Sequence, residues 1–161
     1  KNRRIYVIGG WDGTPKNYVQ YADINPDGTL SAWATTTPIS QTDGISDFAA
    51  AEVNGWIYAA GGYQEESSVF ITSTLWIARI KEDGTLSEWF RGDPMPFAQA
   101  AIGNYYNGRM YVINGYGADY SEVSYISLPA RSIFWGLGIP SNIPANEQFF
   151  GTLTYTSVFS P

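Results

Sequence analysis

Short apolar stretches alternate with turn residues along the chain, and three of these stretches are copies of one another. Each copy has an apolar run around a tyrosine, and two of the three runs end in Gly-Gly. The three tyrosines lie 52 and 53 residues apart, and the copies align without gaps. They are residues 4–11 (RIYVIGGW), 56–63 (WIYAAGGY) and 109–116 (RMYVINGY). A fixed period of this length predicts one structural unit repeated along the chain.

A second string, Asp-Gly-Thr-Leu-Ser-x-Trp, occurs at residues 27–33 and 83–89, here the first and second heptads. Asp-Gly between two strand-like stretches favours a hairpin, because glycine tolerates positive φ and aspartate accepts hydrogen bonds from the turn. The heptads recur in phase with the Gly-Gly runs, which indicates scaffold rather than active-site chemistry. We therefore expect the leucines to face a neighbouring unit and the tryptophans to pack between units. These residues are Leu30, Leu86, Trp33 and Trp89.

Turn signals divide each unit into four predicted antiparallel strands. The run ending in Gly-Gly is the second strand, since glycine permits positive φ or a close backbone approach. Residues 17–24 and 73–80 form the third strand, and the fourth carries the tryptophan of the heptad. A first strand, at residues 48–53 and 98–106, leads through an Asn-Gly turn into the second. Residues 149–158 resemble one more first strand.

With its Gly-Gly strands, later tryptophans and period near 50 residues, the chain resembles the kelch-repeat family. The resemblance implies an all-β fold, a kelch-like β-propeller of four-stranded antiparallel blades, with about three blades in this chain. We expect one propeller portion with repeat units near residues 1–48, 49–101 and 102–161. The third unit departs from the pattern, with Asn114 replacing the first glycine and no Asp-Gly-Thr before Trp135. A β-sandwich is the alternative, but it does not explain gap-free copies.

Propellers typically close with four to eight blades, so three blades predict that something else completes the ring. Either the remaining blades belong to a larger propeller, or a second copy of this chain supplies them. We expect the first arrangement, because Lys1 and Pro161 both look like cuts in a longer sequence.

Composition excludes several classes of catalytic and metal-binding site. The chain has no cysteine and no histidine among its 161 residues, which excludes thiolate nucleophiles, Ser-His-Asp arrangements and the commonest transition-metal ligand. The net charge of −6 disfavours nucleic acid as a partner. No apolar run approaches the roughly 20 residues that span a bilayer, so membrane insertion is not expected. We expect no cofactor, no metal and no catalytic residue, and an extracellular or cell-surface location.

Function is expected where the copies differ, in loops on one face of the propeller. Residues 11–17, 63–68 and 116–122 follow the second strands, and residues 34–47, 90–96 and 136–148 join successive units. In an up-down blade these two sets of loops emerge at the same end. Aromatic rings there could stack on a sugar or anchor a protein, while polar groups bind hydroxyls. The candidate ligand-binding residues are Trp11, Asp12, Asn17, Tyr63, Glu65, Glu66, Arg91, Asp93, Tyr116 and Asp119.

Three functions remain open at this point. The first is a noncatalytic binding module that recognises a glycan or a protein through these loops. The second is a structural repeat domain that assembles a cell-surface or virion appendage. The third is the propeller part of a carbohydrate-active enzyme whose catalytic residues lie outside this chain.

Overall fold

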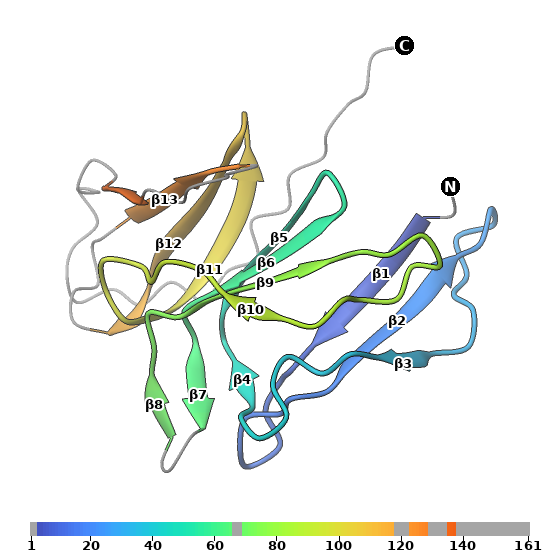
Figure 1. Ribbon diagram of the computed structural model, residues 1–161, viewed down its shortest axis with the longest axis horizontal. Coiled ribbons are helices and arrows are strands. Elements are labelled where there is room, and N and C mark those ends of the chain that lie inside the picture. The colour runs from blue at the N-terminus through green and yellow to red at the C-terminus, as the bar shows by residue number, and fades with distance from the viewer. Residues whose placement is uncertain (1–2, 66–68, 118–122, 129–134, 138–161) are drawn as a thin grey trace.

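A computed structural model describes residues 3–65, 69–117, 123–128 and 135–137, and throughout these residues the only regular structure is β-strand (Figure 1). The strands form three successive antiparallel sheets and one small sheet at their ends. The first sheet contains β1 (Arg3–Ile8), β2 (Val19–Ile24) and β3 (Ala34–Thr36). The second contains β5 (Ala49–Val53), β6 (Trp56–Ala60), β9 (Leu75–Arg79) and β10 (Phe90–Arg91).

The third sheet contains β11 (Gln99–Tyr106), β12 (Arg109–Gly117), β13 (Val123–Ser127) and β14 (Trp135–Leu137). In the second and third sheets the spatial order follows the chain, as the turn chemistry predicts for a four-stranded unit. The expected strand at residues 149–158 and the outer hairpin of the third unit lie outside the described residues.

Alternating apolar positions pack the three sheets against one another. The side chains of β1 alternate, so that Tyr6 and Ile8 face the second sheet while Ile5 and Val7 point away from it. Ile57, on the facing side of the second sheet, is buried against Tyr6 and Ile8. The opposite side of the second sheet packs on the third sheet through a larger cluster. Its members include Tyr58, Leu75, Ile77, Met110, Val112 and Ile126.

Several segments predicted as loops contain strands, among them β3 and β10, which lie in the loops expected to join successive units. Tyr63 begins β7 (Tyr63–Glu65), which pairs with β8 (Val69–Ile71) and with β4 (Ile45–Ser46) in the small sheet. Tyr116 lies inside β12 rather than at the start of a loop. β7 was missed because a short Tyr-Gln-Glu segment has no apolar run, and its pairing depends on backbone hydrogen bonds to distant residues.

Both heptads form the predicted hairpin turn. Asp27 accepts hydrogen bonds from the backbone N–H and the hydroxyl of Thr29, at 3.0 and 2.7 Å. Asp83 holds Thr85 in the same way, at 2.8 and 2.7 Å. The two glycines have φ of 86° and 79°, in the left-handed region that glycine adopts most readily. The two aspartates therefore stabilise the turns.

The expected packing holds only for the second heptad. Leu86 is fully buried between the first and second sheets, and Trp89 packs beside it and donates a hydrogen bond to the carbonyl of Thr37 at 3.2 Å. Leu30 is 44% exposed and Trp33 is 45% exposed. For the first heptad the expected packing is not found among the described residues, because no described sheet stands in front of it.

Candidate functional site

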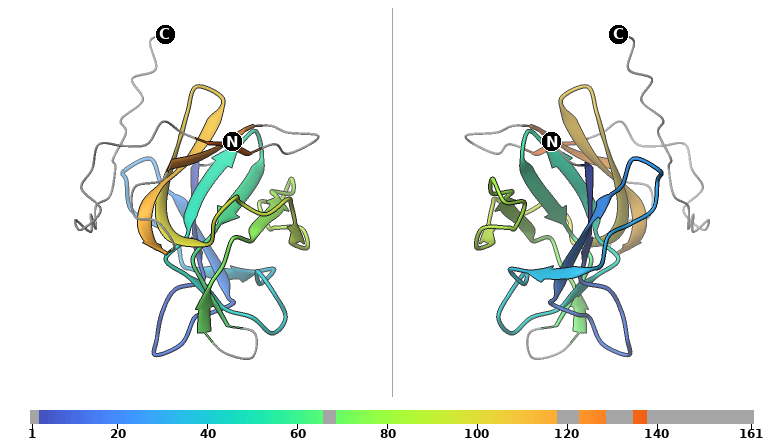
Figure 2. Two further views of the ribbon diagram at one scale, coloured as in Figure 1. Left: turned by 90° about the vertical axis from the view of Figure 1, so that its left-hand side faces the viewer. Right: turned by 90° about the vertical axis from the view of Figure 1, so that its right-hand side faces the viewer.

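Loops from the two predicted sets meet at one end of the molecule, here the loop end, formed by residues 9–17, β4, β7 and β8. β4, from a loop that joins two units, pairs with β7, which follows the second strand of the next unit. The N–H of Gly10 also donates to the carbonyl of Ile45 in β4 at 2.9 Å. These segments lie together at the bottom of Figure 1 and stay there in both views of Figure 2.

The Gly-Gly elements make room for this arrangement. A Cβ on Gly9 would collide with the carbonyl oxygen of Ile45, and one on Gly62 would collide with that of Ser46. Both glycines have positive φ, at 58° and 92°. The predicted reason for these glycines, a close backbone approach with positive φ, is thus confirmed. They let β4 cross the ends of two sheets and join them.

An aromatic pair stands at the loop end. The rings of Trp11 and Tyr63 contact each other edge to face, with centroids 6.4 Å apart and an interplanar angle of 63°. Trp11 is 56% exposed, and Tyr63 is partly buried in β7. An exposed indole held by a second ring offers a fixed apolar face to a ligand. Sequence alone predicted that both residues share this end, but not that they touch.

Charged groups flank the pair. Asp12 lies next to Trp11, with its carboxylate 3.6 Å from the ammonium of Lys16. Glu65 is two residues beyond Tyr63 on the same strand and therefore projects from the same side of β7. Lys16 was not among the predicted site residues. The signal that could have found it is its position four residues after Asp12, in the loop that returns to the sheet.

Asn17 has a structural role in the loop end. Its side-chain amide donates to the carbonyl of Ser40 at 3.1 Å, and its own carbonyl accepts from the N–H of Ile39 at 2.9 Å. These bonds tie the loop between the first two units to the end of β1 and β2. One of the amide hydrogens expected to meet ligand hydroxyls is thereby committed to the fold.

Arg91 lies in a second polar group at this end. Its guanidinium is 4.0 Å from the carboxylate of Asp43 and stands 4.9 Å from the ring centroid of Trp76. Asp93 is exposed in the following loop.

Three of the expected site residues are not placed at side-chain level. Glu66 and Asp119 lie outside the described residues. For Tyr116 the backbone is described as part of β12, but its side chain is not. In the described part of the chain, no cluster of three or more aspartate or glutamate side chains could hold a metal ion. In that same part, no helix is long and apolar enough to cross a membrane.

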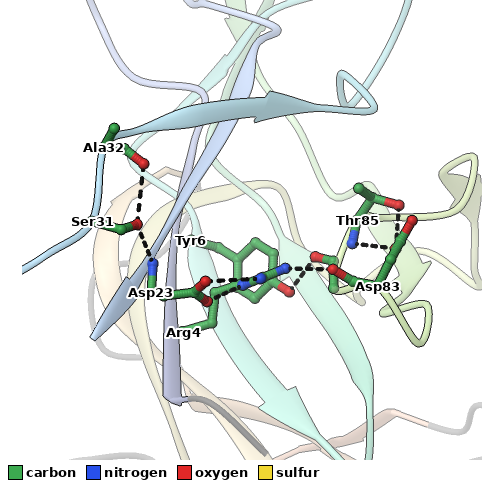
Figure 3. A network of polar contacts seen from close by, with 8 residues as sticks. Arg4, Tyr6, Asp23, Ser31, Ala32, Asp83 and Thr85 are labelled. Atoms are coloured by element: carbon green, nitrogen blue, oxygen red, sulfur yellow. Dashed lines mark hydrogen bonds and ion pairs between the residues drawn. The ribbon is translucent and has the colours of Figure 1, made fainter. Parts of the chain in front are cut away.

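A cavity of about 1260 Å³ opens at the other end of the strands, between the first and second sheets. Its lining includes Arg4, Tyr6, Asn54, Trp56, Arg79 and Asp83. Arg4 pairs with the carboxylate of Asp23 at 2.7 Å and donates to the carbonyl of Asp83 at 3.0 Å (Figure 3). Tyr6 donates its hydroxyl proton to the carbonyl of Gly84 at 2.7 Å. Two of the lining side chains are thus engaged in holding the second heptad.

The electrostatics of this network follow from these contacts. The hydrogen bond from Arg4 lowers the pKa of Asp23, and hydrogen bonds from the threonines lower the pKa of Asp27 and Asp83. Burial raises the pKa of Tyr6. All three aspartates are therefore stabilised as carboxylates, and none has the raised pKa typical of a general acid.

Comparison with known proteins gives likenesses to solved structures and no family. No protein-family profile matches the chain, and no curated protein matches it. Among solved structures, the chain is similar to YjhT with a TM-score of 0.66 and 16% sequence identity. The match covers 84% of this chain and 43% of YjhT, so the matched part spans less than half the length of that protein. At this identity the likeness concerns the fold alone.

Proposed function

We propose that the chain is a kelch-like β-propeller portion that acts as a noncatalytic binding module, with the ligand bound at the loop end. The observation that carries the proposal is the exposed Trp11 ring held against Tyr63 between charged side chains. Three successive antiparallel sheets, their common period and the likeness to YjhT support the propeller.

A glycan is the ligand that suits this surface best. The apolar face of a sugar ring stacks on an exposed indole, and carboxylates beside the indole accept hydrogen bonds from its hydroxyls. Asp12 and Glu65 supply acceptors, and Lys16 supplies a donor. The same combination could anchor an aromatic or basic segment of a protein, which is the alternative ligand.

One observation favours an assembly role as a second function. Ile5, Val7, Leu30 and Trp33 are all between 40% and 45% exposed and belong to the first sheet and its hairpin. Several exposed apolar side chains on one sheet and its hairpin are typical of an interface with another protein. The remaining alternative is the propeller part of a carbohydrate-active enzyme, whose catalytic residues would lie outside this chain.

Binding to a glycan array tests the proposal. We expect Trp11→Ala to lose retention of the glycan that the unchanged protein retains, because the stacking surface is removed. Trp33→Ala is the matched control, since it also removes an exposed tryptophan but from the first heptad, away from the loop end. It should bind as the unchanged protein does.

Titration calorimetry with the retained glycan then separates the roles of the side chains. Asp12→Asn and Glu65→Gln should weaken binding roughly 3- to 10-fold, in line with the loss of one charge-assisted hydrogen bond at an open site. If Trp11→Ala binds with unchanged affinity while its circular dichroism is normal, the loop end is not the binding site.

A further inference from the structure

The second heptad docks on a face of the first sheet built from Arg4, Tyr6 and Tyr21, here the receiving face. Tyr6 and Tyr21 are direct cross-strand partners, with ring centroids 6.1 Å apart. The guanidinium of Arg4 lies 4.3 Å from the ring centroid of Tyr21. Arg4 and Tyr6 then donate to two successive carbonyls of the heptad turn, Asp83 and Gly84. Figure 3 shows Arg4 and Tyr6 reaching across to this turn.

The same three residue types recur on the third sheet in the same register. Tyr111 and Tyr125 are direct cross-strand partners, with ring centroids 6.0 Å apart and the same 44° interplanar angle as Tyr6 and Tyr21. The guanidinium of Arg109 lies 4.7 Å from the ring centroid of Tyr125. This side of the third sheet is turned away from the Met110 and Val112 side that packs on the second sheet. The third sheet therefore presents a second receiving face.

The second sheet is different, and the difference is informative. Trp56 occupies the position of the arginine, and Tyr58 is paired with Ile77 rather than with a tyrosine. The unit that follows the second sheet lacks the Asp-Gly-Thr turn. An arginine and two tyrosines are thus found before a unit that carries the heptad and are absent before a unit that lacks it. This correspondence ties the receiving face to the heptad.

The first heptad finds no such face among the described residues. Leu30 and Trp33 stay exposed, and so do Ile5 and Val7 behind them. At the matching positions of the second sheet, Ile57 and Ala59 are buried. The chain therefore contains a heptad and a receiving face that fit each other, at opposite sides of its row of sheets.

We propose that the first heptad of one copy docks on the receiving face of a second copy, formed by Arg109, Tyr111 and Tyr125. By equivalence with the internal contact, Arg109 donates to the carbonyl of Asp27 and Tyr111 to that of Gly28. Leu30 enters the gap between the two sheets. Two identical contacts of this kind join two copies head to tail in a closed pair, which leaves no heptad unpaired.

Sedimentation velocity on the full chain tests this proposal. We expect a species of twice the 17.8 kDa chain mass, in a concentration-dependent equilibrium with the single chain. Leu30→Glu and Arg109→Glu should each give the single-chain mass with normal circular dichroism, because both residues are exposed. Phe70→Glu is the control, since Phe70 is an exposed aromatic in β8 at the loop end, and it should leave the doubled mass unchanged.

A mixing experiment distinguishes the head-to-tail contact from other dimers. Leu30→Glu retains an intact receiving face, and Arg109→Glu retains an intact first heptad. Their mixture should recover a doubled mass through one native contact, although each variant alone has the single-chain mass. A single-chain mass for the unchanged protein at its highest soluble concentration would overturn the proposal. So would a dimer that survives both substitutions, or a mixture that stays single-chain.

Discussion

The two heptads differ at one position, Ala32 against Glu88, and yet they occupy opposite environments. Their turns share the same aspartate-to-threonine hydrogen bonds and the same positive φ at glycine. Their serines also close the hairpin identically, since Ser31 and Ser87 each accept from the backbone N–H of the preceding strand at 2.9 Å. The exposure of the two leucines is nevertheless very different. Leu30 is 44% exposed and Leu86 is 0% exposed.

This contrast separates what a local sequence specifies from what a neighbour adds. The turn depends on residues within the heptad, so it forms wherever the string occurs. Burial of the leucine depends on the preceding sheet. The N–H of Leu86 donates to the hydroxyl of Thr36 at 2.8 Å, and the hydroxyl of Thr37 donates to the carbonyl of Leu86 at 2.7 Å. The two heptads should therefore contribute differently to the free energy of unfolding, although their turns have the same shape.

The largest expected difference is at the leucines. Leu86→Ala removes a fully buried side chain from a packed cluster and should lower the free energy of unfolding by about 2–5 kcal/mol. Leu30→Ala should change it by less than about 1 kcal/mol, because the side chain is already largely in water. Urea unfolding followed by tryptophan fluorescence, at concentrations where the chain is single, measures both. Equal losses would mean that the heptads have equivalent environments.

A smaller difference is expected at the turn glycines. Both have positive φ, so Gly28→Ala and Gly84→Ala share a backbone strain of about 1–2 kcal/mol. A methyl group on Gly28 meets open space, whereas one on Gly84 collides with the guanidinium of Arg4. Displacing Arg4 costs its hydrogen bond to Asp83, which adds about 1 kcal/mol. The excess should vanish in an Arg4→Ala background, and its persistence there would contradict this account.

Much of the fold could be predicted because its signals are local. Asp-Gly and Asn-Gly turns, and apolar runs that end in glycine, fixed the strand order of each unit. The exposure of Leu30 and Trp33 could not be predicted, since it depends on which sheet stands in front of the first one. The repeated sequence signals are the same whether or not a neighbouring sheet covers a given face.

The candidate site could likewise be predicted only in part. That Trp11 and Tyr63 share one end follows from the up-down order of the strands. Their ring contact depends on β4 pairing with β7, and neither short strand has a pattern that sequence alone reveals. Asn17 illustrates the opposite error, because a polar side chain in a loop was expected to bind ligand and instead holds the backbone of Ser40.

The smallest expected difference between the heptads is in their response to acid. Threonine hydrogen bonds lower the pKa of Asp27 and Asp83 below the ordinary value of 3.8, and Lys81 and Arg4 add a further lowering at Asp83. A carboxylate with a lowered pKa in the folded state stabilises the fold above pH 3.8, and this contribution is lost as the pH falls through the folded pKa.

The urea midpoint of the unchanged protein should therefore fall as the pH is lowered from about 5 towards 2. Asp27→Asn and Asp83→Asn should each make this fall shallower, and Asp83→Asn should do so slightly more, because Arg4 and Lys81 act only on the second heptad. Glu88→Gln is the control, an exposed carboxylate in the same hairpin. If Asp27→Asn flattened the profile more than Asp83→Asn, the charges around the docked turn would not be what distinguishes the two copies.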